Sequence, residues 1–522
     1  MTESFHALFD AAPPERRCIV SADGTALSYG AIGARSRRIA SGLAGLGIRR
    51  GDAVALWMAN GPDWLASFVA CTRLGAMAVG VNARFRGREI GAMLRRTGAR
   101  ILVADLWQGN EQSREIFATI PAPDLDSLAA IIVTATPDDA AWGRHDLAAL
   151  GQMQAHDAPV EAGTPDDSCI VFTTSGTTRA PKLVVHRQRG VVAHARDVAA
   201  AFQLDQDSSC VLQIVPFGGA FGFAQMIGAI AAACPLVAPS VLEPSQAAHL
   251  LRDERVTNMV GANDMLDRML AARTEVSPFP SLRFFGHANF NPALPDLPQR
   301  AASRGVKLRG LFGMSETLAL FAMQPDDAAL DRRGASGGVP ISPQARARVR
   351  DVASGAIAAP GVNGEIELRG PSLMSGYLDD DAQTRAAFTA DGFLRTGDLG
   401  YATDDGGFIH LGRMGDVLRL GGYLVNPLEI EETILENDEL RACQVVEAQR
   451  DGQARPVAFV LRADAAVVDE AKIIAHCRAR LAAFKVPIRV LVLDAFPTVD
   501  GPNGVKIRRD ELRQLAQSHA RI

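Results

Sequence analysis

The segment FTTSGTTRAPK, residues 172–182, decides how the rest of this sequence is interpreted. It follows the apolar residues Ile170 and Val171, and it carries five hydroxyl side chains, one glycine and a final lysine. Small hydroxyls, successive backbone N–H groups and one compact cation suit the oxygens of a polyphosphate. The pattern GxxxxGK[ST] of a Walker A loop is absent, so a solvated Ser/Thr-rich turn is the alternative at this point.

Alternating helical and strand patterns surround this segment. Apolar residues at helical spacing alternate with short apolar runs that are typical of buried strands. In chain order, the expected elements are a helix in 28–48, a strand at 53–59, a helix at 64–76, strands at 101–105 and 169–176, a helix at 191–203, a strand at 210–216 and a helix at 222–233. This order predicts parallel-rich sheets with helices on both faces.

Two further regions follow. Three short strand patterns between Gly and Asp turns, within residues 334–412, predict a small antiparallel β unit. The rest of the chain predicts an α+β domain with a helix at 428–437, strands at 442–449 and 456–463, a helix ending at Phe484 and a strand at 489–493. The predicted fold class is therefore α/β in the large N-terminal part, with the small antiparallel unit and an α+β C-terminal domain.

Length and charge exclude several classes of protein. A chain of 522 residues predicts three or four compact units. A net charge of −5 gives neither the footprint of a nucleic-acid-binding protein nor a polybasic membrane patch. The most apolar run, residues 226–238, is too short to span a membrane. The seven cysteines are scattered and form no CxxC pair, so we expect a soluble, cytoplasmic protein in a reducing compartment.

Four more motifs follow the first segment in order: LFGMSET (311–317), RTGD (395–398), GRMGDVLRLGGYLVNPLEIE (412–431) and NGVKIRRDEL (503–512). Together the five motifs resemble the adenylate-forming superfamily of acyl-CoA synthetases, luciferases and peptide-synthetase adenylation domains. The resemblance covers nearly the whole chain. It implies an adenylation domain at 1–411 that binds ATP and the acid, a hinge at 412–416, and a mobile C-terminal domain at 417–522 that carries the catalytic lysine.

The resemblance implies a role for each motif in nucleotide binding. Glu316 and Thr177 would hold Mg²⁺, for which hard oxygen ligands are appropriate. Asp398 would accept the ribose hydroxyls, and Arg413 would reach the ribose or a phosphate. The ATP phosphates would lie on Thr173, Thr174, Ser175, Gly176, Thr177, Thr178 and Lys182, and the nucleoside on His287, Ala288, Asn289, Phe312, Gly313, Met314 and Ser315. The alternatives are a surface carboxylate for Glu316, a core or surface histidine for His287 and a turn residue for Asp398.

Lys506 is the expected catalytic cation, acting with Glu316 and Arg413. In the family, a C-terminal lysine bridges the substrate carboxylate and the α-phosphate, because two anions that meet there must be neutralised. Val505 stands between Gly504 and Lys506, where the family usually has Gly-Lys. A solvated lysine in a basic tail is the alternative.

The resemblance also implies two half-reactions, first the formation of acyl-AMP and pyrophosphate and then attack by the thiol of CoA. Arg419, Gly421, Gly422 and Tyr423 would serve the CoA pantetheine, because glycines let that arm pass close to the backbone. Gly415 stands at the hinge, where the family usually has Asp or Lys, and glycine permits the required change of backbone torsion.

The expected acid pocket departs most from the family pattern. Gly219 replaces a histidine of the family, and the PFGG segment lacks the aspartate that amino-acid substrates require. Glycines and apolar residues would leave an apolar space for an aryl, alicyclic or medium-length acyl acid. The predicted lining residues are Phe217, Gly218, Gly219, Phe221, Gly310, Leu311 and Met314. Core packing is the alternative for Phe217, Phe221 and Met314.

Three functional hypotheses follow. The leading one is a carboxylic acid–CoA ligase that uses ATP, Mg²⁺ and coenzyme A. The second is an acyl-AMP ligase that loads the pantetheine of a carrier protein, and the third is a non-catalytic relative that binds nucleotide or acyl groups. The third rests on the departures from the family at Arg179, Leu183, Gly219 and Gly415. The sequence predicts no nucleic-acid partner and no membrane span, and it leaves an oligomer open.

Overall fold

The computed structural model describes residues 3–21, 24–83, 85–105, 107–108, 111–134, 145–146, 163–174, 182–239, 243–288, 294, 296–414, 418–420, 423–425, 427–450, 453–463, 468–501 and 504–519. Residues 107–108, 111–112, 145–146, 419, 423–424, 499–501 and 504–506 are described by their main chain alone. The chain forms two compact units, which we call unit 1 (Met1–Asn289, Asp296–Arg346 and Arg369–Leu394) and unit 2 (Phe290–Pro295, Ala347–Leu368 and Arg395–Ile522).

One sheet of unit 1 carries the first motif. Its strands are, in spatial order, β21 (Gly376–Tyr377), β11 (Leu183–Arg187), β10 (Ser168–Thr173), β4 (Met77–Gly80), β3 (Ala53–Trp57), β5 (Ile101–Asp105), β8 (Ala130–Thr134) and β9 (His145–Asp146). The strands from β10 to β9 are parallel, whereas β11 is antiparallel to both β10 and β21. The hydroxyl-rich segment begins in β10 and ends directly before β11.

A second run of strands in unit 1 carries the GMSE motif. In spatial order it contains β18 (Gly337–Pro340), β17 (Ala322–Met323), β16 (Leu308–Phe312), β15 (Phe284–Ala288), β14 (Asn258–Ala262), β12 (Val211–Leu212), β13 (Leu236–Val237), β1 (Arg17–Val20) and β2 (Ala26–Ser28). The strands from β16 to β1 are parallel, and antiparallel strands pair at both ends.

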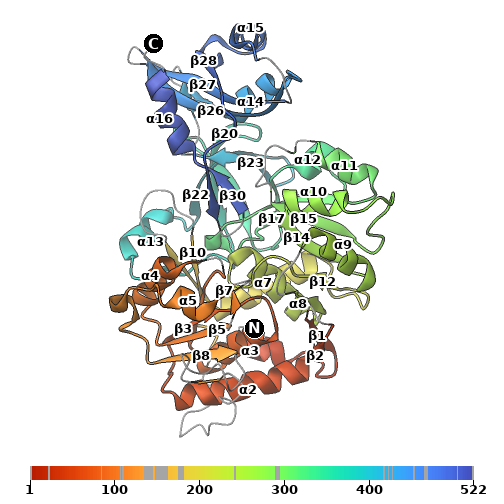
Figure 1. Ribbon diagram of the computed structural model, residues 1–522, viewed down its shortest axis with the longest axis vertical. Helices are drawn as coiled ribbons and strands as arrows, with labels where there is room; N and C mark the ends of the chain where they lie inside the picture. Colours follow the sequence, from red (N-terminus) through yellow and green to blue (C-terminus); the bar gives the residue numbers. More distant parts are fainter. Residues whose placement is uncertain are drawn as a thin grey trace. The chain divides into compact units, whose positions relative to one another are not determined.

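Helices cover these sheets, as alternation in the sequence predicts (Figure 1). The helices of unit 1 are α1 (Phe5–Asp10), α2 (Tyr29–Gly45), α3 (Pro62–Leu74), α4 (Gly87–Thr97), α5 (Ser113–Phe117), α7 (Gln188–Ala201), α8 (Ala220–Ala231), α9 (Pro244–Asp253), α10 (Asn263–Ala271), α11 (Leu297–Ser303), α12 (Leu330–Gly334) and α13 (Asp381–Ala387), with 3₁₀ turns η1 (Ala122–Leu125) and η3 (Ser315–Thr317) and the hairpin β6 (Trp107–Gln108)–β7 (Glu111–Gln112).

One hydrophobic core joins both sheets of unit 1. Ile170 and Phe172 from β10 belong to the same buried cluster as Ile19 of β1 and Leu236 of β13. Helices α2, α3, α7 and α8 contribute to that cluster as well. The prediction of three or four units from length alone is therefore wrong, because a shared core makes the two sheets one unit.

Unit 2 contains a run of four neighbouring strands, β19 (Arg346–Arg350), β20 (Asn363–Arg369), β22 (Leu394–Ala402) and β23 (Phe408–Arg413). Its C-terminal part contains β24 (Leu418–Leu420), β25 (Tyr423–Val425), α14 (Pro427–Leu435), β26 (Leu440–Arg450), β27 (Gln453–Arg462), α15 (Glu470–Arg480), η4 (Ala483–Lys485), β28 (Arg489–Val492), β29 (Thr498–Gly501), β30 (Gly504–Ile507) and α16 (Arg509–His519).

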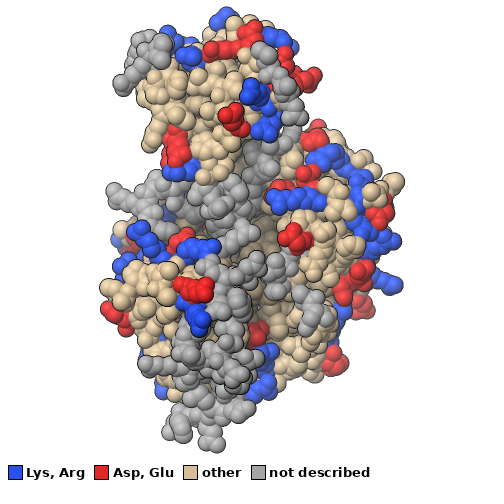
Figure 2. All heavy atoms as spheres, in the orientation of Figure 1, with Lys and Arg blue, Asp and Glu red and all other residues tan. Residues whose placement is uncertain are grey.

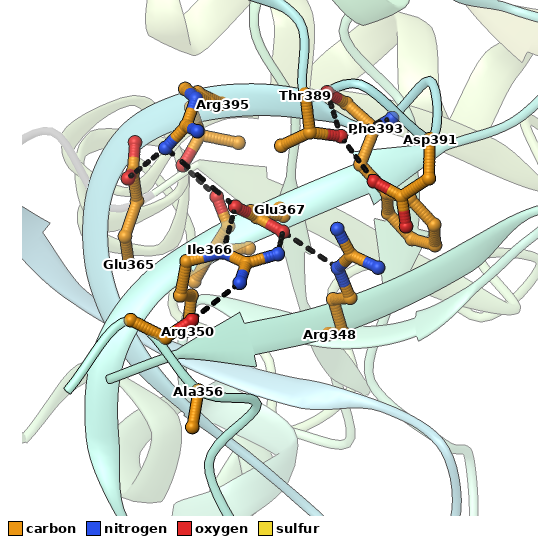
Figure 3. Close-up of polar contacts among 12 residues, drawn as sticks. Arg348, Arg350, Ala356, Glu365, Ile366, Glu367, Thr389, Asp391, Phe393 and Arg395 are labelled. Atoms are coloured by element: carbon orange, nitrogen blue, oxygen red, sulfur yellow. Dashed lines mark hydrogen bonds and ion pairs between the residues drawn. The ribbon is translucent and has the colours of Figure 1, made fainter. Parts of the chain in front are cut away.

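A buried carboxylate stabilises the small β unit (Figure 3). Glu367 of β20 is fully buried and accepts hydrogen bonds of 2.6 Å from Arg348 Nε and 2.6 Å from Arg350 Nε. Arg395 of β22 lies further away, with its Nη1 3.9 Å from Glu367 Oε1. Burial raises the pKa of Glu367, but the hydrogen bonds and charges of Arg350 and Arg348 outweigh it, so the pKa lies below its usual value.

The predicted elements correspond closely to the observed ones, with two differences. Of the strand expected at 210–216, only β12 forms, and Gln213 N donates to Val237 O at 2.8 Å directly after it. The last long helix ends at Arg480 rather than at Phe484, and the short turn η4 follows it.

The surface has the mixed charge that the composition predicts. On the face drawn in Figure 2, the described acidic and basic side chains are interspersed. Within the described residues, no helix is both long and apolar enough to cross a membrane.

Candidate functional site

The ends of the hydroxyl-rich segment are joined by backbone pairing. Thr173 at the end of β10 pairs with Leu183 at the start of β11. Thr174 N donates to Lys182 O at 3.0 Å, and Lys182 N donates to Thr174 Oγ1 at 3.3 Å. These bonds hold Thr174 and Lys182, which flank the undescribed part of the segment, next to each other. Ser175, Gly176, Thr177, Thr178 and Arg179 lie outside the described residues, so their predicted phosphate and metal contacts stay predictions.

Lys182 is linked to Glu316 through Tyr377. Lys182 Nζ donates to Tyr377 Oη at 3.4 Å and lies 4.6 Å from the centroid of the Tyr377 ring. Tyr377 Oη donates to Glu316 Oε1 at 2.9 Å. Glu316 is only 5% exposed, so the alternative of a surface carboxylate is wrong. Lys182 and Glu316 were predicted from separate motifs to bind phosphate and metal, and Tyr377 contacts both of them.

A tightly folded segment carries Glu316. The turn η3 follows Gly313, where an added Cβ would lie 1.0 Å from the carbonyl oxygen of Ala319, so a side chain has no room. Leu318 and Ala319 adopt left-handed φ angles of 56° and 61°, which cost energy for residues other than glycine. The Glu316 carbonyl accepts from Met374 N at 2.8 Å. This folding fixes the direction of the carboxylate.

Two buried histidines support the same segment. His186 Nε2 lies 2.7 Å from Ser315 O, and His194 Nε2 lies 3.0 Å from Leu318 O. Burial lowers the pKa of His186 to about 4 and that of His194 to about 3. Both rings are therefore neutral near pH 7, and in each the Nε2–H donates to the carbonyl.

The predicted nucleoside residues meet at neighbouring strand ends in unit 1. His287 of β15 pairs with Gly310 of β16, and Phe312 ends β16 in a buried position. His287 Nε2 lies 2.9 Å from Gly334 O, and burial lowers the pKa of His287 to about 4. His287 is thus a buried, neutral histidine with a structural partner. Ala288 is half-buried at the end of β15, and Asn289 lies outside the described residues.

At two of the three glycines of the predicted acid pocket, the direction in which a Cβ would point is occupied by main chain, and their pocket role stays a prediction. A Cβ on Gly310 would lie 1.8 Å from Ala335 O, and one on Gly218 would lie 2.9 Å from Val81 O. The main chain occupies the side where those glycines were expected to leave room. Gly219 differs, because its nearest neighbour would be Pro216 O at 3.7 Å.

The larger pocket candidates pack into the core. Phe217 is fully buried, and its ring centroid lies 5.3 Å from that of Trp64. Leu311 belongs to the same core, and Phe221 packs against it. Met314 packs against the small cluster that contains Val184 and Tyr377. The side chain of Phe217 therefore packs in the core, as the alternative for it proposed. A pocket-lining role for these residues stays a prediction.

Asp398 and Arg413 are neighbours in unit 2. Asp398 of β22 pairs with Arg413 of β23, and Arg413 Nε lies 3.1 Å from Asp398 Oδ1. Asp398 is 2% exposed, and His410 Nε2 lies 3.7 Å from the same oxygen. Arg413 Nη1 also donates to Thr396 O at 3.1 Å. The two residues that the RTGD and GR motifs supply therefore form one ion pair.

The predicted catalytic lysine, Lys506, lies in a hairpin of unit 2. Lys506 of β30 pairs with Val499 of β29, and its side chain lies outside the described atoms. Helix α16 follows directly, anchored by Arg509, whose Nη2 lies 3.2 Å from Glu431 Oε1. Around the GGYLV segment (421–425), Leu420 pairs with Tyr423. Gly415, Gly421 and Gly422 and the side chains of Arg419 and Tyr423 lie outside the described part, so their roles stay predictions.

Comparison with known proteins decides the family. The AMP-binding enzyme family matches residues 8–378, and the AMP-binding enzyme C-terminal domain matches residues 429–500. The chain belongs to the AMP-binding enzyme family. The superfamily that the five motifs indicate is thereby confirmed.

Relatives of this AMP-binding enzyme are similar along their whole length. A sulfoacetate–CoA ligase of Cupriavidus necator is 30% identical, and the match covers 96% of this chain and 94% of the relative. A methyl-dioxo-octahydroindenyl-propanoyl:CoA ligase of Mycobacterium tuberculosis is 29% identical, and the match covers 91% of each chain. The ATP-bound crystal structure of MatB from Rhodopseudomonas palustris superposes with a TM-score of 0.86 at 25% identity, covering 100% of both chains.

One residue of the AMP-binding enzyme site, Tyr377, was missed by the sequence motifs. It stands in the segment MSGYLDD (374–380), which none of the five motifs includes. A usable signal existed, because the chain has only four tyrosines, and residue types that are used rarely are worth inspecting one by one.

Proposed function

We propose that this chain is an ATP-dependent, AMP-forming carboxylic acid–CoA ligase. The observation that carries the proposal is the chain of contacts from Lys182, the last residue of the hydroxyl-rich segment, through Tyr377 to Glu316. The full-length relatives named as CoA ligases support the choice of reaction.

In the first half-reaction, a carboxylate oxygen of the acid attacks the α-phosphorus of ATP. The bond to pyrophosphate breaks, so acyl-AMP and pyrophosphate result. Lys182 and the loop hydroxyls would bind the outer phosphates, while Lys506 would neutralise the two anions that meet at the α-phosphorus. Asp398, held by Arg413, would accept the ribose hydroxyls.

The residues present fit a magnesium ion. Glu316 offers a buried carboxylate whose one described partner is a neutral phenol, and carboxylate oxygens are the ligands that Mg²⁺ prefers. Glu316 and Thr177 would hold the ion, which supplies neutralisation of phosphate charge when bound.

In the second half-reaction, the thiol sulfur of CoA attacks the acyl carbon of acyl-AMP. The carbon–oxygen bond to AMP breaks, and the thioester and AMP leave. The domain 417–522 would turn about the hinge 412–416 against the domain 1–411, removing Lys506 and bringing Gly421 and Gly422 to the pantetheine arm.

The acid is proposed to be an aryl, alicyclic or medium-length acyl acid. Gly219 carries this part of the proposal, because its Cβ side is open and its chain neighbours Phe217, Ala220 and Phe221 are apolar. A cytoplasmic location and an oligomer stay predictions.

Pyrophosphate release tests the proposal. The purified chain would be mixed with ATP, Mg²⁺ and a panel of aromatic, alicyclic and acyl acids, first without a thiol. We expect release that depends on the acid, and thioester formation when CoA is added. Thioester formation only on a phosphopantetheinyl carrier protein would favour the carrier-loading ligase instead. Binding of ATP without any acid-dependent release would leave the non-catalytic relative as the correct function.

A further inference from the structure

We propose that Tyr377 is a positioning residue that couples the phosphate-binding ammonium of Lys182 to the metal-binding carboxylate of Glu316. This inference rests on the proposed adenylation reaction. It adds a residue that lies outside every motif discussed above.

The hydrogen-bond directions at Tyr377 follow from the chemistry of its two neighbours. An ionised carboxylate only accepts, so the phenol donates its proton to Glu316 Oε1 across 2.9 Å. An ammonium only donates, so Lys182 Nζ gives a proton to the same phenol oxygen across 3.4 Å. The ring face also attracts that ammonium, which lies 4.6 Å from its centroid. One side chain therefore orients both charged groups.

The main chain around Tyr377 bonds both to the strand that follows Lys182 and to the turn that carries Glu316. Tyr377 pairs with Val184 of β11, two residues after Lys182, and Tyr377 N donates to Thr384 Oγ1 at 2.8 Å. Met374 N donates to the Glu316 carbonyl at 2.8 Å. The segment that carries Tyr377 is therefore attached to both β11 and η3, and Tyr377 itself is only 7% exposed.

A phenol between the two charges has a functional advantage over a direct ion pair. A buried ion pair resists separation, because each charge loses its compensation when the partner leaves. A neutral hydroxyl is exchanged more readily for a phosphate oxygen or a metal ion. Tyr377 therefore holds Lys182 and Glu316 in place while leaving both available, and preorganised groups of this kind add most to transition-state stabilisation.

The variant that tests this coupling is Tyr377→Phe. It removes only the hydroxyl, while the ring keeps its contacts with the cluster of Val184, Met374 and Leu394 and with the Lys182 ammonium. The matched control is Tyr29→Phe, which removes another buried phenol hydroxyl, one that donates to Cys234 O at 3.2 Å in the core.

The first measurement is calorimetric binding of a non-hydrolysable ATP analogue to the full chain, with and without Mg²⁺. We expect Tyr377→Phe to weaken binding about tenfold in Mg²⁺, since a hydrogen bond to a charged group is lost, and to weaken it much less without Mg²⁺. The Mg²⁺ concentration for half-maximal pyrophosphate release should rise in parallel, whereas KM for CoA and the melting temperature should resemble those of Tyr29→Phe.

The double variant Glu316→Gln/Tyr377→Phe decides whether the two residues act together. If Tyr377 acts through Glu316, the hydroxyl loss has little further effect on Mg²⁺-dependent binding once Glu316 is changed. Additive effects of the two substitutions, or equal weakening with and without Mg²⁺, would overturn the proposal. Because binding is measured without turnover, a chain that releases no pyrophosphate would refute the proposed function and still test the coupling.

Discussion

Glu316 in unit 1 and Glu367 in unit 2 are both buried carboxylates, but their surroundings are opposite. Glu316 accepts from a neutral phenol at 2.9 Å, with an ammonium beyond it. Glu367 accepts from two guanidinium groups, each at 2.6 Å, and a third guanidinium stands 3.9 Å away (Figure 3). The charge of Glu367 is thus fully compensated by cations, whereas Glu316, among the described residues, keeps acceptor capacity for another ligand.

The difference separates a structural carboxylate from a functional one. A buried charge that is completely paired serves the fold, because nothing can bind it without breaking existing bonds. A buried carboxylate that rests on one neutral donor has unused acceptor capacity, which suits a cation that arrives with a substrate. Burial alone would not have distinguished them, since Glu316 is 5% exposed and Glu367 is fully buried.

The largest effect is expected from Glu316→Gln. The amide keeps the size of the side chain and an oxygen for the Tyr377 hydroxyl, but it loses the charge that a divalent cation requires. We expect acid-dependent pyrophosphate release to fall at least about a hundredfold, with a nearly unchanged melting temperature. Release assays and a thermal scan on the same preparation measure both quantities. A large loss of thermal stability together with normal turnover would place Glu316 among the structural carboxylates.

The matching change, Glu367→Gln, should lower stability and leave turnover unchanged. It leaves Arg348 and Arg350 facing an uncharged amide, so the free energy of unfolding should fall by about 2 kcal/mol, less than for a fully enclosed pair because both guanidiniums are partly exposed. Urea unfolding measures this loss. Turnover per folded molecule should be preserved, and a selective loss of turnover would show that Glu367 has a role in the reaction.

Sequence reasoning found one of these carboxylates and missed the other. Glu316 was found because it stands inside the LFGMSET motif, whereas Glu367 stands in a plain strand pattern. Its three arginines come from β19 and β22, so only strand register brings them together. Tyr377 was missed for the same reason, since it is 61 residues from Glu316 along the chain.

The fold was more accessible to sequence analysis than the pocket. Helical spacing and short apolar runs predict α2, α3, α7 and α8 and strands such as β3, β5 and β10, because these patterns depend on local periodicity. Whether a glycine leaves space depends instead on what lies opposite. Gly310 faces the main chain of Ala335, whereas Gly219 faces almost nothing. The sequence alone does not distinguish these two glycines.

The stability of the histidines that support the Glu316 segment and that of Glu367 should be lost over different pH ranges. Burial lowers the pKa of His186 to about 4 and that of His194 to about 3, below the ordinary value of 6.5, so these neutral rings stabilise the fold above pH 6.5. As the pH falls from 6.5 towards 4, the unfolded chain takes up protons first, and each histidine should cost about 1.4 kcal/mol per pH unit. The pKa of Glu367 is lowered, so its contribution is lost only below its ordinary value of 4.5.

Urea unfolding at a series of pH values checks this separation. His186→Gln keeps a donor for the Ser315 carbonyl and removes the titrating ring, so it should flatten the curve between pH 6.5 and 4.5. Glu367→Gln should lower the curve by a constant amount above pH 4.5 and change its slope only below that pH. Identical curves for His186→Gln and the unchanged chain would show that His186 accepts a proton in the folded state.

The smallest effect is expected at Arg395, the third guanidinium near Glu367. Its Nη1 lies 3.7 Å from Glu365 and 3.9 Å from Glu367, and its side chain is 44% exposed. Water and salt screen such a pair, so Arg395→Met should lower the free energy of unfolding by less than about 0.5 kcal/mol. The control is Arg350→Met, which removes a donor at 2.6 Å and should cost several times more. Equal losses in urea unfolding would mean that Glu367 depends on total charge nearby, and the contrast with Glu316 would then lie in net charge instead of in hydrogen-bond geometry.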